Sequence, residues 1–155
     1  MKFKSPLLVV NDIEKSKKFY KDVLGLRVIL DFGANVTLTG GVSLQTKESW
    51  KVFIHKENNE ITFKGNDTEL YFEEDDFNSF IEKLNDLNFI EYVHPVMEHS
   101  WGQRVVRFYD LDKHIIEVGE NMKSVCKRFL MSGLSVEETA KKMDVPVKYV
   151  YQCSK

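Results

Sequence analysis

The sequence predicts an α+β fold of two βαβββ modules that form a curved mixed sheet around a pocket, followed by a C-terminal helical tail. Three observations support this prediction. The order strand, helix and three strands occurs twice, and an aspartate suited to capping opens each helix, at Asp12 and near Asp76. The segment 121–155 has helical periodicity. A hydrophobic content of 43%, a charged content of 30% and three prolines are typical of a folded globular chain.

The first module begins with a short apolar run at 6–10, which predicts a buried strand. Asp12 can cap the helix that follows, and Gly25 can end it. Three β-favouring runs come next, separated by glycine-containing turns. They are residues 26–32, 36–38 and 42–46. The less regular segment 47–67 predicts a connector with one short helix.

The second module repeats this order, with a strand at 69–73 and a helix capped by Asp75 or Asp76. Its three remaining strands are predicted at 89–93, 103–109 and 114–119. Aligning Asp12 with Asp76 sets an offset of 64, which places Ser5 opposite Glu69. By the final strand we expect the offset to grow to 72, which pairs Gln45 with Glu117.

Two carboxylates occupy strand positions where apolar residues are usual. Glu117 lies within the run His114–Val118, and Glu69 opens an apolar strand. Burying a carboxylate at such a place costs free energy unless a partner compensates its charge. A metal ion, an arginine or a substrate proton would each be such a partner. We therefore expect both glutamates to point into a hollow shared by the two modules.

The hairpin Trp101–Glu117 (WGQRVVRFYDLDKHIIE), together with Val9–Asp12, Phe19-Tyr20 and Leu24-Gly25-Leu26, resembles sequences of the vicinal oxygen chelate superfamily. This superfamily includes glyoxalase I, bleomycin- and fosfomycin-resistance proteins and extradiol dioxygenases. The resemblance covers roughly residues 3 to 120 and implies the duplicated fold.

The resemblance also implies a site. Four pocket positions hold the metal in metal-dependent members, and by position they fall on Ser5, Gln45, Glu69 and Glu117. None is a histidine, and serine is a poor ligand, so the predicted metal ligands are Gln45, Glu69 and Glu117. Such a site could hold Mn²⁺ or Mg²⁺, and less readily Ni²⁺ or Zn²⁺. Glu117 is the predicted catalytic residue, because glyoxalase-like members use a glutamate there to move a proton next to a carbonyl.

Several alternatives stay open. Ser5, Trp101 and Arg107 are predicted to line the substrate pocket, but Arg107 or Arg104 could instead simply pair with Glu117. The histidines of the second module match no ligand spacing, so we expect surface or loop positions for them. They are His94, His99 and His114. The favoured function is a metal-dependent lyase, isomerase or dioxygenase-like enzyme acting on a small oxygenated compound, and the alternative is a metal-free binding protein of the bleomycin-resistance type.

The tail, residues 121–155, is treated as separate from the glyoxalase-like domain, residues 1–120. It carries a net charge of +4 against −6 for the rest. Ser135 can open a capping box, Pro146 can begin a further helix, and the segment resembles helix-turn-helix sequences. DNA binding by a ligand-sensing core is the least favoured interpretation, because Asp144 stands where glycine is usual and the last helix is short and offers little base-reading chemistry. A packing or dimer-contact role is preferred.

The overall composition favours a small-molecule partner. The net charge of −2 gives no general attraction to nucleic acid or to an acidic membrane. The two cysteines, Cys126 and Cys153, form no disulfide pattern, and the first apolar run is too short for a signal peptide or a membrane span. We therefore expect a cytoplasmic protein, and the family resemblance makes a homodimer the expected assembly.

Overall fold

The computed structural model describes residues 1–153, so Ser154 and Lys155, the end of the predicted tail, lie outside the described residues. The chain divides into two compact units. The first comprises residues 1–68 together with the short turn Tyr109–His114, and the second comprises Glu69–Phe108 with the chain from Ile115 onward. Each unit contains one predicted βαβββ module, so the predicted fold class is confirmed.

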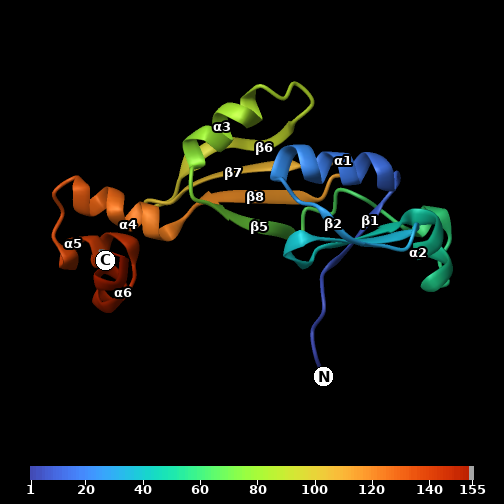
Figure 1. Cartoon of the computed structure of the whole chain (residues 1–155), viewed down its shortest axis with the longest axis horizontal. Coiled ribbons are helices and arrows are strands. Elements are labelled where there is room, and N and C mark those ends of the chain that lie inside the picture. Colours follow the sequence, from blue (N-terminus) through green and yellow to red (C-terminus); the bar gives the residue numbers. More distant parts are fainter. Residues whose placement is uncertain (154–155) are drawn as a thin grey trace. The chain divides into compact units, whose positions relative to one another are not determined.

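The first unit is built on a four-stranded mixed sheet in the order β1-β4-β3-β2, in which β1 and β4 are parallel. Its elements are β1 (Leu7–Val10), α1 (Ile13–Leu24), β2 (Val28–Asp31), β3 (Asn35–Leu38), β4 (Ser43–Thr46) and α2 (Lys47–Phe53), with single 3-10 turns at Thr39–Gly41 and Asn58–Glu60 (Figure 1). Asp12 caps α1 by accepting a hydrogen bond from the backbone of Lys15, as predicted. The predicted short helix of the connector is α2.

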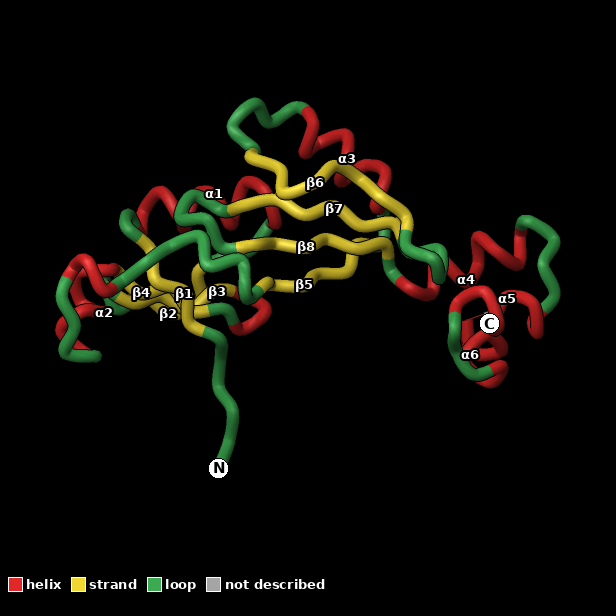
Figure 2. The backbone as a smooth tube through the Cα atoms, turned by 180° about the vertical axis from the view of Figure 1, so that it is seen from behind, coloured by secondary structure: helices red, strands yellow, loops and turns green. Residues whose placement is uncertain are grey.

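The second unit repeats this design with strand order β5-β8-β7-β6, and β5 and β8 are parallel. Its elements are β5 (Glu69–Glu74), α3 (Phe77–Asn85), β6 (Glu91–Glu98), β7 (Arg104–Tyr109), β8 (Ile115–Glu120), α4 (Met122–Met131), α5 (Val136–Met143) and α6 (Val147–Cys153). The four strands lie side by side in Figure 2, and α3 lies over β6 and β7. Asp76, rather than Asp75, caps α3.

Strand β6 is longer than the sequence predicts. The prediction ended the strand at residue 93 and placed a loop around Pro95, whereas β6 runs through Pro95 to Glu98. Proline has no N–H to donate to a neighbouring strand, but β6 lies at the edge of its sheet, where that donor is not needed. The edge position therefore explains why the strand tolerates this proline.

The strand registers refine the predicted repeat. Val10 pairs with Thr46 at the end of the first parallel pair, and Glu74 pairs with Glu120 at the end of the second. With the offset of 64 that the helix caps support, the last strands are related by an offset of 74 and not of 72. The residue in the first sheet that corresponds to Glu117 is therefore Ser43, and Gln45 lies two residues further along the same strand.

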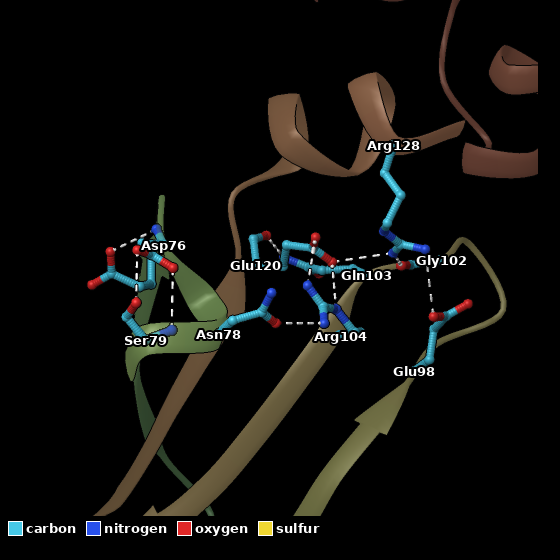
Figure 3. Close-up of polar contacts among 10 residues, drawn as sticks. Asp76, Asn78, Ser79, Glu98, Gly102, Gln103, Arg104, Glu120 and Arg128 are labelled. Atoms are coloured by element: carbon cyan, nitrogen blue, oxygen red, sulfur yellow. Dashed lines mark hydrogen bonds and ion pairs between the residues drawn. The ribbon is translucent and has the colours of Figure 1, made fainter. Parts of the chain in front are cut away.

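The tail folds as three helices on one apolar core. Val125 and Phe129 of α4, Met143 of α5 and Val150 of α6 are buried together. Within the second unit, Arg128 of α4 joins this tail to the sheet: it donates to the carbonyl of Gly102 in the β6–β7 hairpin and to the carboxylate of Glu120 (Figure 3). The tail therefore continues directly from β8 and is tied to the neighbouring hairpin.

None of the helices in the described part of the chain has the length and apolar character that a membrane span needs.

Candidate functional site

A row of four polar side chains crosses the second sheet, with one residue from each strand. Glu69 comes from β5, Glu117 from β8, Arg107 from β7 and His94 from β6. Side chains alternate across a strand, so these residues share one face while their neighbours in sequence face the other way. On β7, for example, Arg104 reaches α3 and donates to Asn78, whereas Arg107 joins the row. We call these four residues the charged row.

Arg107 is the centre of the charged row because all three of its side-chain nitrogens have partners. Its Nε donates to Oε2 of Glu69 at 2.9 Å, its Nη2 forms an ion pair with Oε2 of Glu117, and its Nη1 lies 3.2 Å from Nε2 of His94. Glu117 is 5% exposed, and Arg107 is the cation that its Oε2 faces. The alternative in which Arg107 pairs with Glu117 is thus present in the structure, while Arg104 binds Glu120 instead.

The ring of His94 has a polar partner at each nitrogen. Its Nδ1 lies 2.7 Å from the carbonyl oxygen of Pro95. Its Nε2 lies 3.2 Å from Nη1 of Arg107. His94 lies half-buried on the edge strand β6 and not in the loop that the sequence predicted there. Because Pro95 follows His94, the sequence alone favours a loop here, and the edge position of β6 is what permits a strand.

A second set of polar and aromatic groups lies beside the charged row on the same face of β5. Tyr71 donates its hydroxyl proton to Glu73 and accepts a hydrogen bond from Nε2 of Gln103. Gln103 in turn accepts from the indole of Trp101 at 3.2 Å. A side chain at Gly119 would meet the Gln103 amide at 2.8 Å and the Tyr71 ring at 3.2 Å, so the glycine makes their approach possible. Sequence reasoning predicted Trp101 here but missed Tyr71 and Gln103.

The ring of His99 stacks on Trp101, with centroids 4.1 Å apart. Partial burial, together with the charges of Arg107 and His94 nearby, lowers the pKa of His99. This imidazole is therefore neutral at neutral pH. The hairpin thus presents a flat, uncharged pair of rings.

The first sheet has a neutral counterpart of the charged row. Ser5 and Ser43 place their hydroxyl oxygens 3.0 Å apart, and Thr37 lies 3.5 Å from Ser43. By register these serines correspond to Glu69 and Glu117, so the first module has hydroxyls where the second has charges. Gln45 accepts a hydrogen bond from Asn35 at 2.7 Å and donates to Ser49, within the first unit. The structure brings Glu69, Glu117 and Arg107 together in one unit, while Ser5 and Gln45 belong to the other.

The charges within the charged row bear on whether it could hold a divalent metal ion. Glu69 and Glu117 are the two carboxylates in it, and the Arg107 guanidinium already supplies the positive charge between them. Among residues 1–153, no group of three or more His, Cys, Asp or Glu side chains lies close enough together to hold an ion. Within the second unit Arg107 thus balances both carboxylates, and the ligand set Gln45, Glu69 and Glu117 stays a prediction.

The aspartate-rich turn has a structural explanation within the first unit. Asp110 is 4% exposed and accepts hydrogen bonds from the Tyr20 hydroxyl at 2.8 Å, from two backbone amides of the turn and from Nδ1 of His114. Burial, reinforced by the Asp110 charge, raises the pKa of Tyr20 well above its ordinary value. Burial likewise raises the pKa of Asp112, although Asn11 donates two hydrogen bonds to it. His114 is therefore held in the turn and is not a free surface histidine.

The duplicated βαβββ module is the fold of the vicinal oxygen chelate class of proteins, and the chain belongs to that class. Comparison with known families identifies a glyoxalase-like domain over residues 3–123, and the chain belongs to that family.

Solved structures agree with this membership. A protein of unknown function from Agrobacterium tumefaciens str. C58 is 36% identical, with a TM-score of 0.70, and the match covers 78% of this chain and 94% of that one. A glyoxalase/bleomycin resistance protein/dioxygenase from Nocardioides is 17% identical, with a TM-score of 0.62 over 77% of this chain and 83% of its own. A protein described in the same way from Burkholderia phytofirmans PsJN is 15% identical, with a TM-score of 0.64 over 76% and 96%. These last two share the fold. A search of curated proteins gives no significant match.

The family membership leaves three expectations as predictions. They are the catalytic role of Glu117, the homodimer and the cytoplasmic location.

Proposed function

We propose that this protein is a metal-independent small-molecule binding protein of the glyoxalase-like family, and that the ligand binds on the face of the second sheet that carries the charged row. One observation supports this most directly: Arg107 lies between Glu69 and Glu117 and compensates both carboxylates. Because buried carboxylates need a compensating charge, an internal guanidinium removes the need for a metal ion.

The charges of this face favour a particular kind of ligand. Glu69, Glu73 and Glu117 bring three negative charges to it, and Arg107 brings one positive charge. Trp101 and Tyr71 lie beside the row and offer aromatic surface, which attracts a cationic group. The proposed ligand is therefore an aromatic or amphipathic molecule with a positively charged nitrogen.

A pair of probes tests the charge preference. Benzylamine and benzoate have the same ring but opposite charges, and their binding is followed by the thermal unfolding midpoint of metal-free protein. At a ligand concentration ten times the Kd, binding adds about 1.4 kcal/mol, which raises the midpoint by roughly 3–6 °C. We expect a rise with the amine that Glu69→Gln reduces. A larger rise with benzoate would contradict the proposal.

The alternative is a metal-dependent lyase or isomerase in which Glu69 and Glu117 would hold the ion. Calorimetric titration of the purified protein with Mn²⁺, Mg²⁺, Ni²⁺ and Zn²⁺ separates the two functions. We expect no saturable uptake by the wild-type protein. Uptake that Glu117→Ala abolishes, while Lys18→Ala on α1 leaves it unchanged, would overturn the metal-independent proposal in favour of the enzyme.

A further inference from the structure

The turn between α5 and α6 has the length of a helix-turn-helix connection and contains a left-handed residue. Only three residues, Asp144 to Pro146, separate the two helices. Asp144 adopts the left-handed conformation with φ 55° and closes α5 through its own backbone N–H. Aspartate is one of the few residues other than glycine that visit this region, so its presence here does not disrupt the turn. The objection that Asp144 raised against this motif is thereby removed.

The three helices of the tail hold this turn rigidly. Ser135 and Glu138 form a complete capping box at the start of α5. Ala140 and Met143 of α5 and Val150 of α6 are buried in the core shared with α4. Because α4 is itself joined to the sheet through Arg128, the turn is supported by the folded domain and does not depend on α6 alone.

The outer face of α6 is exposed and carries both polar and apolar side chains. Val147 and Tyr151 are 40% and 54% exposed, and Lys148 and Gln152 are exposed beside them. Val147 and Tyr151 are four residues apart, and so are Lys148 and Gln152. The two pairs therefore lie side by side on one face of the helix, opposite buried Val150. Three exposed lysines flank the turn, two in the last turn of α5 and one in the first turn of α6. They are Lys141, Lys142 and Lys148.

We propose that the tail binds duplex DNA, with the exposed face of α6 in the major groove and the three lysines on the phosphate backbone. The groove admits an α-helix, and a helix-turn-helix presents its second helix there. The tail has a charge of +4 while the rest of the chain has −6, so the attraction to phosphate is local to this end. Contacts to phosphates, more than to bases, supply the affinity.

The test uses the full chain and a fluorescein-labelled duplex of mixed sequence, with binding measured by fluorescence anisotropy. Three phosphate contacts predict that the Kd rises roughly 40-fold between about 50 and 200 mM salt. Lys148→Ala should weaken binding several-fold and lower the slope of log Kd against log salt by about 0.9. Lys18→Ala on α1 removes the same charge elsewhere and should leave both unchanged. The thermal midpoint of each variant verifies that it is folded.

Three results would overturn the proposal. The first is the absence of an anisotropy change at the lowest salt concentration. The second is an equal loss of affinity in Lys148→Ala and Lys18→Ala, which would indicate attraction to the whole protein. The third is equal affinity for duplex RNA, whose narrow major groove α6 cannot enter. Sedimentation that shows dimers disrupted by Lys148→Ala, without DNA binding, would assign the same face to contact between two copies.

Discussion

Replacing Arg107 by methionine tests the central contact of the charged row. Methionine keeps most of the aliphatic packing of the arginine stem but removes the charge shared by Glu69 and Glu117. Breaking a buried ion pair by removing one partner typically costs 3–5 kcal/mol, because the other charge stays buried. Glu117 is 5% exposed and cannot rehydrate, but the side chains of Arg107 and Glu69 are 24% and 38% exposed. We therefore expect a cost of about 3 kcal/mol, near the lower limit of that range.

Urea unfolding followed by circular dichroism measures this cost. If the cost comes from the unpaired buried carboxylate of Glu117, the double variant Arg107→Met/Glu117→Gln should regain about half of the lost unfolding free energy, since the amide carries no charge. Arg107→Met/Glu69→Gln is the matched control. Glu69 is more exposed, so this control should recover less than about 1 kcal/mol. Purely additive costs in Arg107→Met/Glu117→Gln would refute the reasoning.

Three other predictions concern stability. The pKa of Glu120 is raised by burial, but hydrogen bonds from two arginines outweigh this and lower it overall. The stabilising contribution of Glu120 is therefore complete above its ordinary pKa of 4.5 and is lost as the pH falls through the lowered pKa. The difference in unfolding free energy between wild type and Glu120→Gln should accordingly narrow in acid. A difference that stays constant with pH would contradict this. Gly102→Ala should lower the unfolding free energy measured in urea by about 2–3 kcal/mol, because φ is +89° and the new Cβ would lie 2.1 Å from the Phe129 ring. Gly133→Ala is the control: its φ is +96° but the space around it is open, so this change should cost about 1 kcal/mol. Tyr20→Phe should lower the unfolding free energy by about 1.5 kcal/mol, since it removes one charged hydrogen bond while Asp110 keeps its other donors. An unchanged urea midpoint of unfolding would refute this contribution of Tyr20.

Local patterns in the sequence predict most of the fold. Helix caps, turn residues and apolar spacing act over a few residues, so Asp12 and the capping box at Ser135 could be recognised directly. The errors arose where strand pairing decides the outcome. Pro95 marked the end of a strand in the sequence but is tolerated at a sheet edge, and His94 became part of the charged row as a result.

By itself the sequence determined the duplicated module, the three-helix tail and the acidic character of the positions 69 and 117. Only the tertiary structure decided which residues share the site. Register between parallel strands depends on how two distant segments pack, and a shift of two residues keeps the same face while exchanging Gln45 for Ser43. The partner of Glu117 likewise depends on how β7 pairs with β8. Arg104 and Arg107 both lie on β7 but face opposite sides of the sheet, and only the pairing shows that Arg107 neutralises Glu117.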